Sequence, residues 1–332
     1  MSSPNLPPIS PEILTPSAPE VELHAALMLA LRMLPPTTAE ALRWSVIAET
    51  RRKPAAIGVL VVARNAQRGI AGAAWGQLGS GNVAQVWPTQ WLVDREVSGC
   101  DPLLAALVAE LPRRGATFAQ TLLPDAVCHD AQTMLRAGFT HAADLAYLGA
   151  DVDPRGATQA ATDLHFVPVE SHERSEFAAL VEATYEGTLD CPALNGLRPA
   201  LEVLDEYAEI GSSGTSLWQR AVEKNVDVGC LLLADHPAQN QVELVYMALL
   251  PHARGRGLGR QLVRESLRIA AVLGRKRIVL AVDAANRPAA AQYEAAGFRE
   301  WERRSAFVQD LRRPRADDEP RDNSRRSKPL QN

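Results

Sequence analysis

The residues best suited to do chemistry form a glycine-rich turn with the sequence RGRGLGR, preceded by a strand-like run and followed by a helical pattern. Glycines let the backbone turn sharply and take positive φ, so successive N–H groups can converge on an anion at the positive end of a helix. The three arginines add charge that a pyrophosphate or a ribose phosphate would use. A turn without a ligand is the alternative interpretation, because such a turn alone is a weak signal. The turn consists of Arg254, Gly255, Arg256, Gly257, Leu258, Gly259 and Arg260.

A second segment with chemistry-bearing residues runs from Asn286 to Phe298 and reads NRPAAAQYEAAGF. It follows the turn after one helix-like and one strand-like stretch. The common nucleotide-binding loops fit the turn poorly, since the chain has no GxxxxGK[ST] and its glycines are spaced GxGxG, not GxGxxG. A dinucleotide-dependent dehydrogenase is therefore disfavoured.

The two segments together resemble the GNAT superfamily of N-acetyltransferases. The family carries an R/Q-x-x-G-x-G/A turn followed by N-x-x-A-x-x-x-Y-x-x-x-G-F, and this chain matches every fixed position in the same order. The matching residues are Arg254, Gly257, Gly259, Asn286, Ala289, Tyr293, Gly297 and Phe298. The resemblance covers about residues 164 to 311, and it implies an acyltransferase that uses acetyl-CoA as its co-substrate.

The resemblance also implies where the co-substrate binds, namely between the strand before the turn and the next parallel strand. The N–H groups of the turn would hold the pyrophosphate, and backbone groups of Met247 and Leu249 would contact the acetyl carbonyl and the pantetheine arm. The Met247 N–H would be the oxyanion donor. Asn286 would contact the cofactor or fix the strand ends. The predicted cofactor-binding residues are Met247, Ala248, Leu249, Arg254, Gly255, Arg256, Gly257, Leu258, Gly259, Arg260 and Asn286.

Two proton transfers accompany acyl transfer to a primary amine. A lysine-like amine has a pKa of about 10, so a base must first remove its proton. By resemblance this base is Glu243, acting directly or through a water, with a surface or ion-paired glutamate as the alternative. Tyr293 holds the family position of the donor to the CoA thiolate, with a core tyrosine as the alternative. We expect direct attack in a ternary complex, without a metal or a cysteine nucleophile.

The acceptor is the least determined part of the prediction. Glu186 and Asp190 lie between the first two helical patterns of the second half, where GNAT folds often form the acceptor wall, and they could receive a cationic substrate. The acceptor would be an amine on a small molecule or a protein. The alternatives are another acyl-CoA, a non-amine acceptor such as a hydroxyl, and a non-catalytic module that senses acyl-CoA.

Composition bounds the remaining functions. The 332 residues suggest two domains, and a net charge of −4 does not favour nucleic acid or an anionic membrane as a partner. The four cysteines show no metal-binding spacing, and no apolar stretch is long enough to cross a membrane. We therefore predict a cytoplasmic protein, of which the oligomeric state is not predicted.

The chain also contains a faint internal repeat. The motif Ala-Gly-Phe ends at Phe139 and again at Phe298, an offset of 159 (298 − 139) that also places Gly115 on Gly274. At this offset the first half lacks the candidate catalytic residues and most of the candidate cofactor-binding residues of the second half. Pro88, which has no N–H, stands in the place of Met247. The other replacements are Ala84 for Glu243, Ser98 for Gly257, Cys100 for Gly259, Val127 for Asn286 and Met134 for Tyr293. The first half is thus predicted to be a degenerate GNAT-like domain, an arrangement also found in mycothiol synthases, in which the second half is active.

These observations predict an α/β protein, with mixed sheets in two tandem GNAT-like folds of the acyl-CoA N-acyltransferase type. The predicted boundaries are a disordered segment at 1–18, the degenerate domain at 19–150, a linker at 151–163, the catalytic domain at 164–312 and a disordered tail at 313–332. In the second half, hydrophobic periodicity predicts helices at 173–185, 197–210, 260–273 and 287–296. It predicts strands at 164–169, 217–222, 226–234, 242–250, 278–282 and 304–311.

Overall fold

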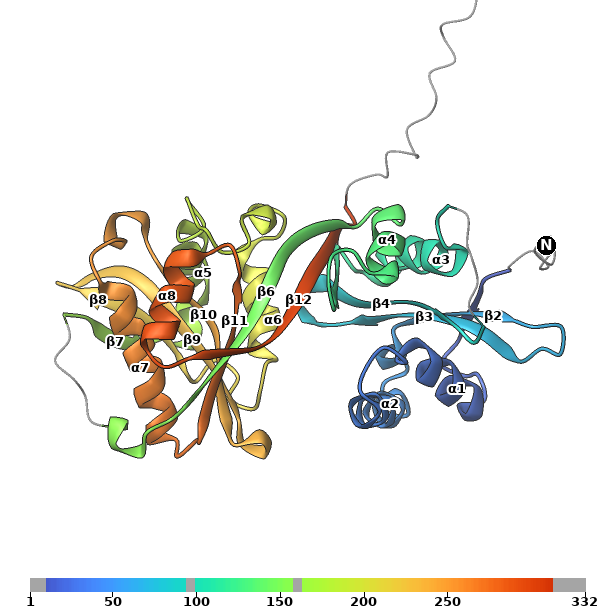
Figure 1. The fold of residues 1–332 in the computed structure, drawn as a ribbon, viewed down its shortest axis with the longest axis horizontal. Helices are drawn as coiled ribbons and strands as arrows, with labels where there is room; N and C mark the ends of the chain where they lie inside the picture. The colour runs from blue at the N-terminus through green and yellow to red at the C-terminus, as the bar shows by residue number, and fades with distance from the viewer. Residues whose placement is uncertain (1–9, 94–98, 158–162, 313–332) are drawn as a thin grey trace, which may run out of the picture.

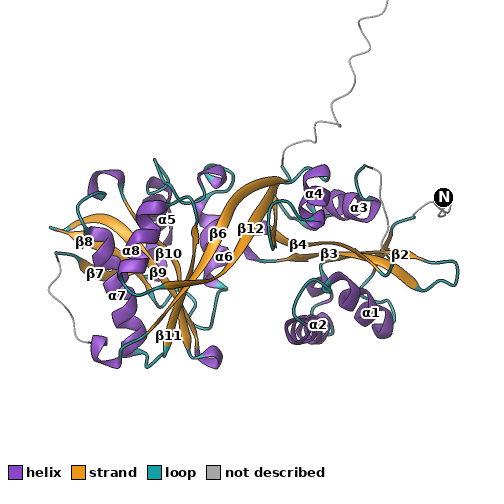
Figure 2. Ribbon diagram, in the orientation of Figure 1, coloured by secondary structure: helices purple, strands orange, loops and turns teal. Residues whose placement is uncertain are grey.

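The computed structural model describes residues 10–93, 99–157 and 163–312. Its strands form one twelve-stranded mixed sheet in the order β1-β2-β3-β4-β5-β12-β6-β11-β10-β9-β8-β7. Only the pairs β4–β5 and β10–β11 are parallel among the paired strands of the described residues. Helices pack on both faces of the sheet, and the two halves of the chain lie at its two ends (Figures 1 and 2).

The described residues of the first half form four α-helices and the strands β1 to β6. The helices are α1 (Glu20–Ala30), α2 (Pro36–Thr50), α3 (Pro102–Glu110) and α4 (His129–Arg136). The strands are β1 (Glu12–Leu14), β2 (Val59–Arg64), β3 (Ile70–Leu78), β4 (Val83–Trp91), β5 (Phe118–Leu123) and β6 (Thr140–Asp151).

The second half repeats this order of elements. Its helices are α5 (Arg174–Ala183), α6 (Ala200–Ala208), α7 (Leu258–Val272) and α8 (Arg287–Ala295). Its strands are β7 (His165–Pro168), β8 (Trp218–Glu223), β9 (Val226–His236), β10 (Gln241–Leu249), β11 (Arg277–Asp283) and β12 (Arg299–Asp310). All predicted helices and strands of this half are present, which confirms the mixed α/β fold and the repeat.

The repeat is visible in matching backbone features. Gly138 and Gly297 both take a left-handed conformation, with φ of 95° and 94°, at the ends of α4 and α8. The phenylalanine after each glycine is buried in the core of its half. Glycine is needed at both positions because a residue with a Cβ would be strained there.

The halves exchange their last strands. β6, from the first half, pairs with β11 of the second half, and β12, from the second half, pairs with β5 of the first half. β12 and β6 also pair with each other and join the two sheets into one (Figure 1). Each predicted domain, 19–150 and 164–312, is a continuous stretch of sequence. In the structure, however, each of the two parts of the sheet includes one strand from the other stretch.

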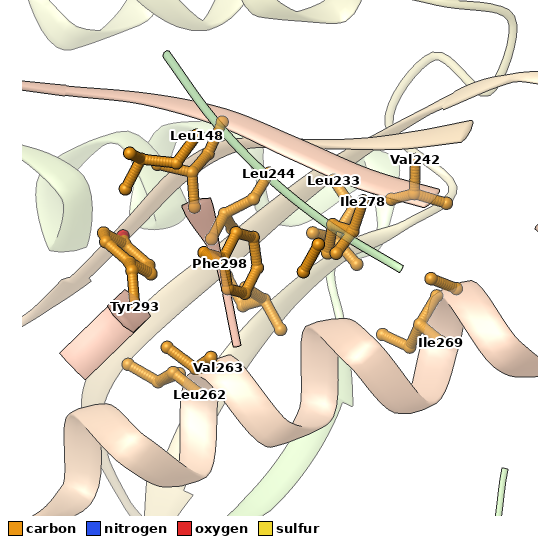
Figure 3. Close-up of a cluster of buried hydrophobic side chains, with 14 of the residues drawn as sticks. Leu148, Leu233, Val242, Leu244, Leu262, Val263, Ile269, Ile278, Tyr293 and Phe298 are labelled. Atoms are coloured by element: carbon orange, nitrogen blue, oxygen red, sulfur yellow. The ribbon is translucent and has the colours of Figure 1, made fainter. Parts of the chain in front are cut away.

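The two faces of the sheet are continuous through the exchanged strands. We define face A as the face covered by α1, α2, α5 and α6, and face B as the face covered by α3, α4, α7 and α8. The largest core lies on face B, where α7 packs Leu262, Val263 and Ile269 against the strands (Figure 3). Arg303 and Ala146 are cross-strand partners on face B, whereas Glu302 and Tyr147 are partners on face A.

Two sequence predictions need correction. The segment 1–18 was expected to be disordered, but residues 12–14 form β1, because Leu14 is buried against the core under α1. β12 begins at Arg299, earlier than predicted, since its first residues pair with β6. Residues 1–9, the tail 313–332, Ser98 and part of the predicted linker lie outside the described residues. In the described part of the chain, no helix combines the length and apolar character needed to cross a membrane.

Candidate active site

A cavity of about 670 Å³ opens where β10 and β11 diverge. Their parallel pairing ends at Leu244 and Leu280, and an irregularity in β10 follows directly, between Leu244 and Tyr246. Such a bulge bends a strand away from its neighbour. The predicted residues that line the cavity are Asp190, Met247, Ala248, Leu249, Arg254, Gly255, Gly257, Gly259, Arg260, Asn286 and Tyr293.

One end of the cavity is the amino terminus of α7. Gly255 and Gly257 take left-handed φ of 74° and 78°, and Gly257 is the N-cap residue without a capping side chain. Within the described residues, no protein group accepts a hydrogen bond from the N–H groups of residues 255–259. A Cβ on Gly259 would lie 2.3 Å from the side-chain oxygen of Gln292, so this glycine lets α8 approach α7. The open N–H groups and the helix dipole make this end an anion site.

The arginines of the turn do not all serve that site. The Arg254 guanidinium donates to the backbone oxygens of Leu249, Thr184, Glu186 and Gly187, at 2.7–3.0 Å. Its predicted charge contact with a phosphate does not fit this geometry, because the guanidinium instead ties the end of β10 to the loop after α5. Arg256 points away from the cavity and pairs with Glu223 at 2.7 Å.

Arg260 and Leu258 complete the turn. Arg260 lines the cavity, is exposed, and has no side-chain partner among the described residues, so it can meet a phosphate. The Leu258 side chain is buried in the core under α7, and only its backbone faces the anion site.

The middle of the cavity is bordered by unpaired backbone of β10. The Leu250 N–H donates to Val228 O at 2.8 Å, across the pair β9–β10. Because N–H directions alternate along a strand, those of Ala248 and Tyr246 also point to β9, whereas those of Met247 and Leu249 point to the gap beside β11. The Met247 N–H can therefore donate to a carbonyl oxygen placed in the gap.

Tyr293 on α8 also lines the cavity. Its ring packs on Phe298, with 5.6 Å between ring centroids, and its side chain is 6% exposed. Burial, with a smaller contribution from the Asp190 charge, raises the pKa of Tyr293 well above its usual value. The phenol is therefore a neutral O–H donor at physiological pH.

Asp190 and Asn286 hold the loop before α6 against the end of β11. Asp190 accepts a hydrogen bond from the Asp283 N–H at 2.9 Å, and the Asn286 side chain is a second partner. Burial raises the pKa of Asp190. Asn286 also caps α8 by accepting from the Ala289 N–H at 3.3 Å. Glu186, the other residue predicted for the acceptor, is exposed and does not line the cavity.

Glu243 lies on face A, outside the residues that line the cavity. Its carboxylate is 2.9 Å from His236 Nε2, a partner on β9 that the sequence prediction missed. The two residues are diagonal neighbours across the hairpin, because His236 pairs with Gln241. The spacing across the turn could have indicated this pair. Glu243 as a base stays a prediction.

The sequence prediction also missed cavity residues with polar side chains, among them Gln292, Tyr246 and Thr184. Gln292 lines the cavity beside Tyr293, and its side-chain oxygen is buried without a partner among the described residues. Tyr246 hydrogen-bonds Thr184 at 2.8 Å, and both border the cavity. Gln292 directly precedes the predicted tyrosine, but its position allows any residue in the motif.

Among its described residues, which do not include 94–98, the first half has no open equivalent of the anion site. Its parallel strands also diverge early, after Gln85 and Gln120, and Pro88 follows in β4. The N-cap of α3 is Asp101, whose carboxylate accepts from the N–H groups of Leu103 and Leu104 at 2.9 and 3.1 Å. The position that an anion would take is occupied by the chain's own carboxylate.

Comparison with known proteins assigns the second half to a family. Residues 181–298 match the model of the acetyltransferase (GNAT) family. At the level of sequence, no functionally curated protein matches the chain.

Solved structures share the fold over most of the chain. A GCN5-related N-acetyltransferase from Sphaerobacter thermophilus is 17% identical with a TM-score of 0.54, covering 92% of this chain and 96% of that chain. A tandem GNAT protein from the clavulanic acid biosynthesis pathway is 15% identical with a TM-score of 0.51, covering 92% and 99%. A glucosamine N-acetyltransferase region of a fungal multi-domain GH3 beta-N-acetylglucosaminidase is 13% identical with a TM-score of 0.58, covering 92% of this chain and 39% of that chain. At these identities the similarity shows the fold alone.

Proposed function

Since residues 181–298 form a domain of the GNAT acetyltransferase family, we propose that the second half transfers an acetyl group from acetyl-CoA to a primary amine. The observation that carries this proposal is the cavity between β10 and β11, which is lined by the amino terminus of α7, with N–H groups that have no acceptor among the described residues, and by Tyr293. The acyl donor, the amine acceptor and the cytoplasmic location stay predictions.

The residues present fit a CoA thioester. The unpaired N–H groups of residues 255–259, at the positive end of α7, match a pyrophosphate, and Arg260 adds a free cation beside them. The cavity volume of about 670 Å³ falls within the range of ligand sites, roughly 300–1,000 Å³. The Met247 N–H would hold the acyl carbonyl oxygen and stabilise the charge that develops on it.

The reaction requires a group that accepts the proton from the amine and a group that donates a proton to the CoA thiolate. The amine nitrogen attacks the thioester carbon, the C–N bond forms and the C–S bond breaks. Tyr293, kept neutral by burial, donates its proton or a hydrogen bond to the leaving sulfur. Glu243, paired with His236, would receive the amine proton through a water, because it lies on face A outside the cavity.

Calorimetric titration with acetyl-CoA and CoA tests the donor site. We expect one binding site in the wild type and its loss in Gly257→Glu, since a carboxylate would repel the phosphates at the N-terminus of α7. The matched control is Gly115→Glu, because Gly115 also has a left-handed φ and no atom within 4 Å of an added Cβ. The control should bind acetyl-CoA as the wild type does.

The other outcomes are equally informative. Two sites would contradict the closed anion site of the first half. Absence of binding in the wild type would refute the acetyltransferase proposal. If binding is found, release of free thiol in the presence of amines tests transfer.

A further inference from the structure

A second cavity, of about 260 Å³, lies on face A at the junction of the two halves. The first half contributes Met33 after α1, Trp87 on β4 and Leu122 on β5. The exchanged strands contribute Tyr147 from β6 and Arg304 from β12. We call this space the junction cavity, and no residue of the glycine-rich turn or of the segment 286–298 is among its lining residues.

The junction cavity lies next to the cavity between β10 and β11. Tyr147 is the cross-strand partner of Ala281, and Ala281 lines the first cavity, so one strand spacing of about 5 Å separates the two linings. Glu243 pairs with Val279 of β11, two residues from Ala281, so Glu243, Ala281 and Tyr147 lie on the same face of the sheet. Burial, with a smaller contribution from the Glu302 charge, raises the pKa of Tyr147. The predicted base therefore lies on face A, as the lining of the junction cavity does.

The lining of the junction cavity combines apolar walls with a polar edge. The Trp87 ring is held by stacking on Trp75, with 4.3 Å between centroids and an angle of 18°. At the edge, Arg304 Nε donates to Glu302 at 2.7 Å. The volume is just below that of typical ligand sites, so the cavity fits one ring rather than a peptide.

We propose that the junction cavity binds the body of the acceptor, which is a primary amine carried on a single planar apolar ring. The ring packs against Trp87 and Leu122, and the amine extends past Tyr147 toward Glu243 and the thioester. This inference rests on the proposed function. It gives the first half a role in substrate selection, because β6, which pairs with β11, contributes Tyr147 to the cavity and β4 contributes Trp87.

The test compares 2-phenylethylamine with n-butylamine as acceptors for the full chain. We expect KM to be at least tenfold lower for 2-phenylethylamine, and direct titration of the CoA-saturated protein should show that only this amine binds at millimolar concentration. Leu122→Trp fills the cavity, so it should abolish the preference while the Kd of acetyl-CoA changes less than twofold. If Leu122→Trp does not fold, the milder Leu122→Phe should reduce the preference three- to fivefold.

Arg303→Gln is a control on the opposite face of the sheet. Arg303 precedes Arg304 on the same strand and forms the same kind of ion pair, with Glu300, but it lies on face B. This variant should keep both the preference and acetyl-CoA binding.

The outcomes separate the two proposals. If acetyl-CoA binds but 2-phenylethylamine neither binds nor is preferred, or if the Leu122 variants keep the preference, the junction cavity is not the acceptor site. If acetyl-CoA itself does not bind, the proposed function fails first.

Discussion

The two halves share a fold but differ at the helix that follows the fourth strand of each. In the first half the buried carboxylate of Asp101 fills the amino terminus of α3, where it also accepts from Thr89 and from the Trp91 indole. In the second half Gly257 leaves the same position on α7 open. The comparison teaches that the backbone alone does not make an anion site. One residue type at the N-cap decides whether the helix dipole is satisfied by the chain or is available to a ligand.

The exchange of strands makes the halves dependent on each other, and deleting β12 should have the largest effect of any change considered. β12 lies between β5 and β6 and buries Phe307 and Val308 in the first half. A chain ending at Phe298 would leave β5 and β6 each without one of their two partner strands and would divide the sheet in two. We therefore expect no cooperative thermal unfolding, measured by circular dichroism. A chain ending at Arg312 is the control and should keep the transition. Cooperative unfolding of the shorter chain would show that the halves are independent.

Removing the carboxylate of the first half should destabilise the protein without creating a ligand site. Asp101→Ala removes an N-cap and leaves the Thr89 and Trp91 donors without this acceptor, which we expect to cost about 2–4 kcal/mol in urea unfolding. Asp125→Ala removes an exposed turn acceptor in the same half and should cost less than about 1 kcal/mol. Calorimetry should still find one acetyl-CoA site, because Pro88 offers no N–H. A second acetyl-CoA site in Asp101→Ala would mean that the Asp101 carboxylate alone prevents the first half from binding acetyl-CoA.

Much of the fold followed from the sequence, because its signals are local. Hydrophobic periodicity predicted the elements of the second half, and the glycines at 138 and 297 marked helix ends that only glycine tolerates. The exchange of β6 and β12 could not be predicted, since a repeated chain offers two similar sheet edges and either can accept either strand. Similarly, the motif located the cavity, but the role of Arg254 depends on the loop carbonyls that surround it in space.

Tyr293→Phe tests whether the phenol is what makes the second half catalytic. The first half has Met134 at the corresponding core position and therefore already lacks the phenol. We expect kcat to fall roughly 100-fold, the lower end of the range for general acid catalysis, with the KM for acetyl-CoA changed less than twofold. Burial raises the pKa of Tyr293, so the wild type should keep this donor beyond pH 10. The deficit of the variant should shrink above about pH 8.5, where a thiolate leaves without a proton. Tyr185→Phe, outside the cavity, is the control, and an equal loss there would assign the effect to packing.

The smallest effect should come from the loops that follow the first helix of each half. In the first half Arg32 fixes this loop from the exposed side, by donating to Trp91 O at 3.0 Å. In the second half the corresponding loop is fixed by the half-buried Asp190, which accepts a hydrogen bond from the Asp283 N–H. Asp190→Asn keeps an acceptor for the Asp283 N–H, so we expect acetyl-CoA affinity to be unchanged, an acceptor KM two- to threefold higher, and a stability change within about 1 kcal/mol at pH 7.

The stability difference between the wild type and Asp190→Asn should depend on pH in a definite direction. Burial raises the pKa of Asp190 in the folded state, so its neutral form favours folding below about pH 4, and this contribution is lost as pH rises through the folded pKa. The asparagine in the variant does not titrate, so its stability does not change in this way. Urea unfolding at pH 4.5 and 7.5 should therefore show that the free energy of unfolding of the wild type, relative to that of Asp190→Asn, is higher at pH 4.5. If the acceptor KM stays unchanged while this pH difference is present, Asp190 only fixes the loop. The asymmetry between the halves would then lie in the helix N-caps and in Tyr293, not in the loops.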